Sequence, residues 1–155
     1  MSNHYLIRRA RRCDLNELLR LESWFHGDRI SRRGFLYLLR HGHADLLVAE
    51  GTNTLIGNVV ILYRRNSSKA YLYSIVVDQS ARGQGIGRAL LNAGELAARD
   101  YGRTSMVLEV REDNDSAQNL YHRADYHKIG RVLDYYDDGI AALRMSKLIS
   151  STLFN

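Results

Sequence analysis

The segment "QSARGQGIGRALLNA" (79–93) places three glycines at alternate positions between Arg82 and Arg88. The apolar run "YLYSIVVD" (71–78) precedes it, and apolar residues at helical spacing follow it. Glycine is costly inside a helix and loses more conformational freedom on folding than any other residue. A turn needs one glycine, so three indicate that the backbone must come close to a ligand. The pattern predicts a strand, a ligand-binding loop and a helix in direct succession.

Known phosphate-binding loops narrow the choice of ligand. The dinucleotide pattern G-x-G-x-x-G fails because Arg88 occupies the third glycine position, and the G-K-[ST] ending of a Walker loop is absent. A pyrophosphate cradle remains, in which backbone N–H groups converge at a helix N-terminus and the helix dipole favours the anion. The alternative is a plain flexible turn. The residues assigned to the cradle are Arg82, Gly83, Gln84, Gly85, Ile86, Gly87 and Arg88.

Length and composition favour one globular domain over residues 1–155. A chain of 155 residues buries roughly 70% of its unfolded surface. Apolar residues make up 45% and charged residues 25%, as in ordinary soluble proteins. No apolar run approaches the roughly 20 residues that span a bilayer, so we expect no membrane partner. The single cysteine, Cys13, excludes an intrachain disulfide and favours a cytoplasmic location.

The net charge of +5 suits an anionic ligand. A nucleic acid is an unlikely partner, because aromatic residues do not interleave with a basic stripe. The histidines and the cysteine show no metal-ligand spacing, so we expect no metal. The sequence leaves open whether the protein is a monomer or a homodimer.

Hydrophobic periodicity predicts an α/β fold with a mixed sheet. Asp14 and Ser31 are candidate helix N-caps, and the crossover between strands 69–78 and 104–111 requires these two to run parallel. The expected elements, in order, are strand 5–10, helices 14–25 and 31–40, strands 45–51, 54–64 and 69–78, a helix from Ile86, strand 104–111, helix 114–124 and strands 126–136 and 139–147. The apolar stripe expected on the helix after the loop consists of Ile86, Ala89, Leu90, Ala93, Leu96 and Ala97.

Two segments carry a resemblance to a known family. "ARGQGIGRALL" resembles the R-x-x-G-x-G/A signature of the GNAT acetyltransferases. "LEVREDNDSAQNLYHRADY" (108–126) is similar to a segment of the ribosomal-protein-alanine N-acetyltransferases. The resemblance implies the GNAT fold: a mixed, mostly antiparallel central sheet splayed between strands 4 and 5 and flanked by about four helices. It also implies an N-acetyltransferase that uses acetyl-CoA as cosubstrate.

The chain departs from that subfamily in three places. Asp125–Tyr126 replaces a glycine-phenylalanine pair, and Gln79 stands where a proline is usual. "GIAA" (139–142) replaces an acidic pair before the last strand. The last change lies near the expected acceptor pocket, so it leaves the peptide specificity open.

Glu109 is the candidate general base, acting directly or through water. A carboxylate is unusual in an otherwise apolar strand, and burial would raise its pKa toward a useful value. The resemblance implies the same role, while a salt bridge to Arg111 or to another strand is the alternative. For Tyr121 the resemblance implies a general acid that protonates the departing thiolate, and simple packing is the alternative.

The resemblance also implies contacts to the pantetheine arm of the cosubstrate. Asn114 matches a family asparagine that bonds this arm, although it is equally a plausible helix N-cap. Ile75, Val76 and Val77 would pair with the pantetheine amides through their backbone groups, as if the cosubstrate were another strand.

The acceptor pocket is expected between two connections. Trp24, Phe25, His26 and Asp28 lie in the first, and Tyr135 and Tyr136 lie in the second. The substrate-binding candidates are Trp24, Tyr135 and Tyr136, which are otherwise ordinary surface aromatics.

The favoured acceptor is a protein N-terminal amine. Its pKa near 8 makes deprotonation at pH 7 cost roughly 1.4 kcal/mol, against roughly 4.6 for lysine. We expect direct transfer, because Cys13 is distant in sequence from the reaction centre. A small-molecule amine such as a polyamine, an amino acid or an antibiotic is the alternative acceptor. A non-catalytic module that senses acyl-CoA is the alternative from another functional class.

Overall fold

The structure, a computed structural model, describes residues 4–25 and 29–149, and the element order over these ranges confirms the predicted one. Short 3₁₀ helices at Arg12–Asp14 and Gln79–Ala81 are the additions. The strands are β1 (Leu6–Arg9), β2 (Ala44–Glu50), β3 (Leu55–Tyr63), β4 (Lys69–Val77), β5 (Ser105–Arg111), β6 (His127–Val132) and β7 (Ala142–Leu148). The helices are α1 (Leu15–Glu22), α2 (Arg32–Arg40), α3 (Ile86–Asp100) and α4 (Asp115–Arg123).

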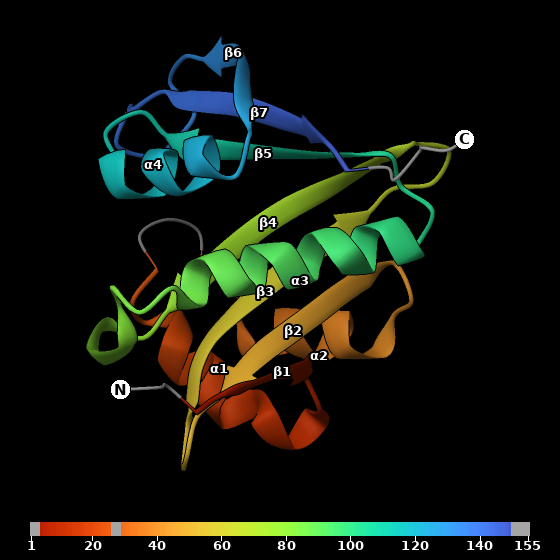
Figure 1. Cartoon of the computed structure of the whole chain (residues 1–155), viewed down its shortest axis with the longest axis vertical. Helices are drawn as coiled ribbons and strands as arrows, with labels where there is room; N and C mark the ends of the chain where they lie inside the picture. Colours follow the sequence, from red (N-terminus) through yellow and green to blue (C-terminus); the bar gives the residue numbers. More distant parts are fainter. Residues whose placement is uncertain (1–3, 26–28, 150–155) are drawn as a thin grey trace.

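The strands form one mixed sheet with helices on both faces. Its order is β1-β2-β3-β4-β5-β7-β6, so the apolar strand β4 is central, as predicted. All neighbouring strands are antiparallel except β4 and β5. Helix α3 crosses one face over β2, β3 and β4, with α4 beside β5 on that same face, while α1 and α2 cover the opposite face (Figure 1). Two apolar clusters fill these layers, one on each face.

Strands β4 and β5 part along most of their length. They pair only where Lys69, Ala70 and Tyr71 face Ser105, Met106 and Val107. Beyond that point β4 remains paired to β3 as far as Val77, whereas its other edge has no strand partner among the described residues. The predicted splay between the fourth and fifth strands is confirmed.

A β-bulge in β4 lies just beyond the paired region. Val60 of β3 faces Ser74 and Ile61 faces Leu72, so Tyr73 is the extra residue. A bulge leaves one residue unpaired and bends the strand. It also shifts the alternation of side chains: Leu72 packs under α3, whereas Val76 packs against the α1/α2 layer. The bulge thus accompanies the departure of β4 from β5.

Helix α3 buries a face that differs from the predicted stripe. Leu96 is 55% exposed, so its place in the stripe was wrong. Leu91 and Gly94 are buried in its place, and a Cβ on Gly94 would lie 3.1 Å from the Ile61 side chain, so helix and sheet approach closely there. Glu95 is buried too, because its carboxylate pairs with Lys147 at 2.9 Å and accepts a hydrogen bond from Tyr126 at 2.8 Å. A hydropathy pattern assigns a carboxylate to the exposed face, so it cannot identify a buried face that contains a paired glutamate.

The two predicted N-caps have different outcomes. The Ser31 hydroxyl accepts a hydrogen bond from the backbone N–H of Gly34 at 3.1 Å and caps α2, which confirms the prediction. Asp14 occupies the N-cap position of α1, as predicted, but its side chain makes no cap hydrogen bond to that helix. Its carboxylate instead accepts hydrogen bonds from Arg8 at 2.8 and 2.9 Å, which ties β1 to the start of α1.

Glu22, at the end of α1, provides a pH-dependent stability prediction. It is buried: Oε2 accepts the backbone N–H of Ile30 at 2.6 Å, while Oε1 has no hydrogen-bond partner among the described residues. Burial raises the pKa of Glu22 above its ordinary value. Its contribution to stability is therefore fully present below the unfolded pKa of about 4.3 and is lost as pH rises through the folded pKa.

We expect Glu22→Gln to gain stability relative to wild type as pH rises, because glutamine carries no charge to desolvate. Urea unfolding of both proteins at pH 4.5 and pH 7.5 measures the difference in free energy. A gap between the two proteins that is equal at both pH values would contradict this account.

Candidate active site

Two adjoining cavities open on the face of β5 that points away from α4. Their volumes are about 450 and 370 Å³, and both are lined by Tyr71, Glu109 and Tyr135. Side chains alternate along a strand, so Glu109 points to this face while Leu108 and Val110 enter the core beneath α3 and α4. The predicted two-faced pattern of this strand is confirmed, and it places the candidate base at the meeting point of the cavities.

The Glu109 carboxylate is held by three neighbours. Oε2 forms a 3.0 Å ion pair with Arg144, the residue directly opposite on β7. Oε1 accepts hydrogen bonds from the hydroxyl of Tyr71 and, at 3.2 Å, from that of Tyr135. These donors fix the orientation of a side chain that is only 8% exposed.

The salt-bridge alternative is thus partly realised, with Arg144 rather than Arg111 as the partner. Arg111 pairs instead with Asp113 at 3.0 Å and with Asp138 at 2.7 Å. The ion pair with Arg144 does not exclude Glu109 as a general base, because Glu109 still borders both cavities and can meet an acceptor there.

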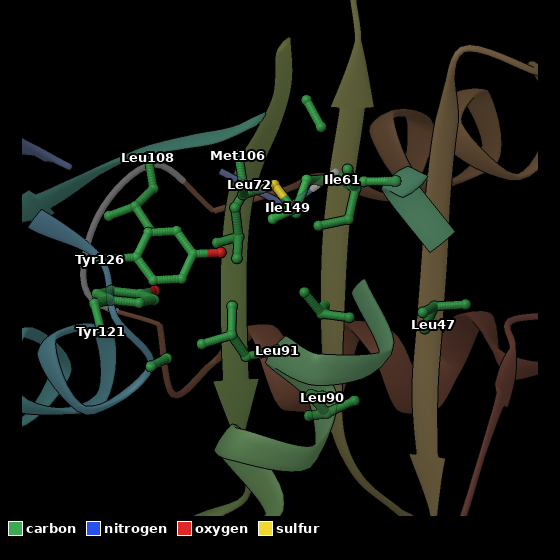
Figure 2. Close-up of a cluster of buried hydrophobic side chains, with 14 of the residues drawn as sticks. Leu47, Ile61, Leu72, Leu90, Leu91, Met106, Leu108, Tyr121, Tyr126 and Ile149 are labelled. Carbon is green, nitrogen blue, oxygen red and sulfur yellow. The ribbon is translucent and has the colours of Figure 1, made fainter. Parts of the chain in front are cut away.

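Tyr121 lies in the core on the opposite face of β5. Its ring packs edge-on against Tyr126, with centroids 5.7 Å apart, in the buried cluster that also contains Leu108 (Figure 2). No described residue forms a hydrogen bond with its hydroxyl, which is therefore available to a ligand. Burial, with a smaller effect from nearby Tyr136, raises the pKa of Tyr121, so the phenol keeps its proton at neutral pH.

The two candidate catalytic residues therefore approach the parted strands from opposite faces. Glu109 extends from β5 toward the cavities, and Tyr121 extends from α4 beneath the sheet. Tyr136 is close enough to influence both regions: it lines the smaller cavity and also raises the pKa of Tyr121. A group inserted between β4 and β5 would have one of these residues on each side.

The glycine loop leads directly into α3. Gly83 and Gly85 both have φ of +80°, a conformation that side chains with a Cβ rarely adopt, and an added Cβ at either position would enter open space. Gly87 has no such constraint; its Cβ would make ordinary contacts with Leu120 and Val77. Within the described ranges, no group accepts a hydrogen bond from the backbone N–H of Gly83, Gln84 or Gly85. These free donors at the start of a 15-residue helix are arranged as an anion cradle requires.

The two arginines of the loop have no carboxylate partner in the described part of the chain. Arg82 donates to the carbonyl of Val77 at 3.3 Å, and Arg88 donates to the carbonyl of Arg123 at 3.1 Å. Their charges are therefore not neutralised, and Arg88 also links the start of α3 to the end of α4. Ile86 is buried, so only its backbone is available to a ligand, while Gln84 is exposed.

The remaining candidates for contact with the cosubstrate lie in two places, the open edge of β4 and the N-terminal cap of α4. Ile75, Val76 and Val77 lie where β4 has left β5, so their backbone edge is open in the way the pairing hypothesis requires. Asn114 caps α4, with Oδ1 accepting the backbone N–H of Ala117 at 3.1 Å. Its cap role occupies the oxygen and leaves its amide nitrogen for any contact with a ligand.

Two of the three predicted acceptor-binding residues line the cavities, and the third does not. Tyr135 lines both cavities and Tyr136 lines the smaller one, and their rings pack edge-on at 4.9 Å. Trp24 is 38% exposed and lines neither cavity, whereas its neighbour Phe25 lines the smaller one. His26 and Asp28 lie outside the described residues.

Sequence reasoning did not single out several cavity residues. Tyr71, Tyr73, Arg144 and Asp138 line one or both cavities. The alternation of Tyr71 and Tyr73 with buried Ala70 and Leu72 was the available signal, because two hydroxyl-bearing rings on one face of a central strand are unusual. Nothing local marks Arg144, whose role depends on strand register.

Comparison with known proteins decides the family. Residues 6–126 match the model of the acetyltransferase (GNAT) family. The chain belongs to the GNAT acetyltransferase family. It is therefore an acyltransferase enzyme, and the resemblance carried by its two sequence segments is confirmed.

Relatives of this GNAT protein include enzymes named for N-terminal acetylation. An N-alpha-acetyltransferase of Sulfurisphaera tokodaii is 28% identical over 92% of both chains. The N-alpha-acetyltransferase RimI of Mycobacterium tuberculosis is 37% identical over 61% of this chain and 59% of that protein. The ribosomal-protein-S18-alanine N-acetyltransferase of Escherichia coli has the same fold, with a TM-score of 0.85, 24% identity and 98% coverage of each chain.

Residues 4–25 and 29–149 contain neither a membrane-spanning helix nor a metal-binding cluster. None of the helices there is long and apolar enough to cross a membrane. No group of three or more histidine, cysteine or acidic side chains in those same ranges could hold a metal ion.

The GNAT family uses acetyl-CoA, and the loop of this member fits its pyrophosphate. The fit rests on the free N–H groups of Gly83, Gln84 and Gly85 and on the unneutralised Arg82 and Arg88. We expect Gly85→Val to abolish most of the rise in melting temperature that acetyl-CoA causes by mass action, because the side chain would fill the open space above the loop. NAD and ATP should raise the melting temperature of wild type far less.

The matched control is Gly102→Val. Gly102 has φ of +90° and equally open surroundings, so the backbone strain of roughly 1–3 kcal/mol is comparable. It lies after the other end of α3, far along the helix from the loop. If both variants keep the full acetyl-CoA shift, the loop has no part in binding.

Proposed function

We propose that this GNAT protein transfers an acetyl group from acetyl-CoA directly to a primary amine, and that the preferred acceptor is a protein N-terminus. The observation that supports this most is the parting of β4 and β5 beside the glycine loop. It leaves an open backbone edge at Ile75, Val76 and Val77, with Glu109 on one face of the sheet and Tyr121 on the other. This arrangement has the three parts that the reaction needs: an anion cradle, a base and an acid.

Acetyl-CoA supplies the acetyl group as an activated thioester. Glu109 takes the proton of the acceptor amine at its carboxylate, directly or through one water molecule. The Tyr121 hydroxyl provides the proton that the departing sulfur needs. Each proton transfer by a positioned group accounts for roughly 10²–10⁴ in rate. The Tyr71 and Tyr135 hydroxyls keep the Glu109 carboxylate aimed at the cavities.

Two arguments favour an N-terminal amine. An α-amino group costs roughly 3 kcal/mol less to deprotonate at pH 7 than a lysine side chain does. The relatives from Sulfurisphaera tokodaii and Mycobacterium tuberculosis are both named as N-alpha-acetyltransferases.

The test is a screen for CoA release with acetyl-CoA as donor. The acceptors are peptides with a free N-terminus, the same peptides blocked at the N-terminus but bearing a lysine, and small amines that include a polyamine. We expect kcat/KM to be highest for the free N-termini. Faster turnover of a small amine would favour the alternative acceptor class, and binding of acetyl-CoA without turnover of any amine would favour a sensor.

A further inference from the structure

The larger cavity is lined by two positive side chains that have no role in the proposed acetyl transfer. Besides the Glu109–Arg144 pair, its charged lining residues are Arg64 and Lys69. Neither has a carboxylate partner in the described part of the chain, and the Arg144 charge is already matched by Glu109. The Ser67, Tyr71 and Tyr135 hydroxyls also line this cavity, and Leu62 and Val107 provide apolar walls. Two unneutralised cations in a hollow of about 450 Å³ favour an anionic occupant.

The smaller cavity has the opposite charge. Asp137 and Asp138 line it together with Arg111, which is already paired with Asp138 at 2.7 Å. Asp137 has no ion pair within the described ranges. Both cavities meet at Glu109, so the site is acidic on one side of the base and basic on the other. An acceptor with a cationic amine and a nearby anion matches this polarity.

Strand register gives the spacing between base and cations. Lys69 and Tyr71 lie opposite Ser105 and Val107, so Glu109 is four residues further along the sheet than Lys69. At a rise of about 3.3 Å per residue, the Cα atoms of Lys69 and Glu109 are about 13 Å apart along the strand direction. An acidic side chain on the second residue of an extended peptide covers most of this distance, and the flexible Lys69 side chain covers the rest.

We propose that the Arg64–Lys69 cavity selects acceptors that carry a carboxylate on the second residue of the peptide. The inference rests on the proposed function and deepens it by naming the substrate class. The amine lies at Glu109, and the acidic side chain extends toward the start of β4. Because Arg64 and Lys69 are both exposed, their attraction is screened by salt and modest in size.

The test compares peptides that differ in one side chain. We expect an Ala-Glu N-terminus to exceed Ala-Gln in kcat/KM by about 5–10-fold at low salt, as expected for two exposed charges. Ala-Lys should be the slowest of the three. Moving the glutamate to the fifth residue should remove the advantage, and 0.5 M salt should reduce it.

Variants of the chain then identify the source of the preference. The double variant Arg64→Gln/Lys69→Gln should bring the Ala-Glu to Ala-Gln ratio close to one. Arg65→Gln removes the same charge from the next residue, which is exposed but lines neither cavity, and should leave the ratio unchanged. The variants are compared by this ratio, so a general loss of activity does not imitate the effect.

Three results would overturn the inference while leaving the proposed function intact. They are equal kcat/KM for Ala-Glu and Ala-Gln in wild type, a preference that persists in the double variant, and faster acetylation of free glutamate than of the Ala-Glu peptide. The last result would assign the basic cavity to a small acidic amine. If neither peptide is acetylated although acetyl-CoA binds, the proposed function fails and the inference fails with it.

Discussion

Tyr121→Phe is expected to lower turnover by roughly 10²–10⁴-fold, the usual contribution of a positioned general acid. The ring and its packing against Tyr126 are retained, and the lost hydroxyl has no hydrogen-bond partner among the described residues. Stability should therefore change by less than about 1 kcal/mol. Acetyl-CoA should still raise the melting temperature, because the glycine loop is untouched.

The decisive measurement uses two thioesters that differ in the basicity of the departing thiolate. A less basic thiolate needs its proton less, so the rate ratio of wild type to Tyr121→Phe should shrink with the better leaving group. A constant ratio would assign Tyr121 to positioning or packing rather than to acid catalysis.

Tyr126→Phe is the matched control. It removes a hydroxyl from the neighbouring ring, but that hydroxyl donates to the buried carboxylate of Glu95 at 2.8 Å. Removing a donor from a buried carboxylate costs about 1–3 kcal/mol of stability. We therefore expect the two variants to show opposite profiles, with Tyr126→Phe losing stability and keeping turnover within a few-fold of wild type.

Glu109→Gln should lower kcat/KM by roughly 10²–10⁴-fold near neutral pH, where few acceptor amines are unprotonated. The loss should shrink as pH rises toward the pKa of an α-amino group, near 8, because free amine then becomes abundant. A pH profile of kcat/KM from 6 to 9.5 for wild type and variant measures this rescue. Affinity for acetyl-CoA should remain close to that of wild type.

Stability separates the catalytic role of Glu109 from a structural one. Glutamine loses the ion pair with Arg144 but retains an oxygen for Tyr71 and Tyr135. Glu112→Gln is the control: it breaks an exposed pair with Arg131, including a 2.8 Å hydrogen bond, just beyond the end of β5. Such a fully exposed pair contributes little to stability, because water and salt screen it. If Glu109→Gln unfolds the protein or its loss does not depend on pH, the salt-bridge interpretation prevails.

The predicted roles differ in how directly local sequence supported them. The glycine loop could be found from the sequence because Gly83 and Gly85 need a backbone conformation that few other residues tolerate. Glu109 could be found because a carboxylate breaks an apolar alternation. Tyr121 depended on family resemblance, since a tyrosine on an amphipathic helix has no local feature that separates a catalytic phenol from a packed ring.

Hydrophobic periodicity alone did not predict the buried face of α3 correctly. The predicted stripe of α3 included Leu96 and excluded Glu95, and the structure reverses both. Lys147 and Tyr126, which partner Glu95, are far away in the chain, so nothing near Glu95 indicates that it can be buried. Asp14 is similar: its position suggests a cap, but Arg8 takes its carboxylate.

The sequence by itself determined the order of the elements, the parallel crossover after β4 and the position of the glycine loop before α3, because these depend on local periodicity and on backbone conformation. Only the tertiary structure decided what surrounds Glu109. Arg144 reaches it through the register of β5 with β7, and Tyr71 reaches it from β4 across the sheet. The opposite charges of the two cavities arise in the same way, since Arg64 and Lys69 come from the β3–β4 end and Asp137 and Asp138 from the β6–β7 connection. Contacts between distant segments follow from strand register and bulges, which small packing differences fix and no short stretch of sequence encodes.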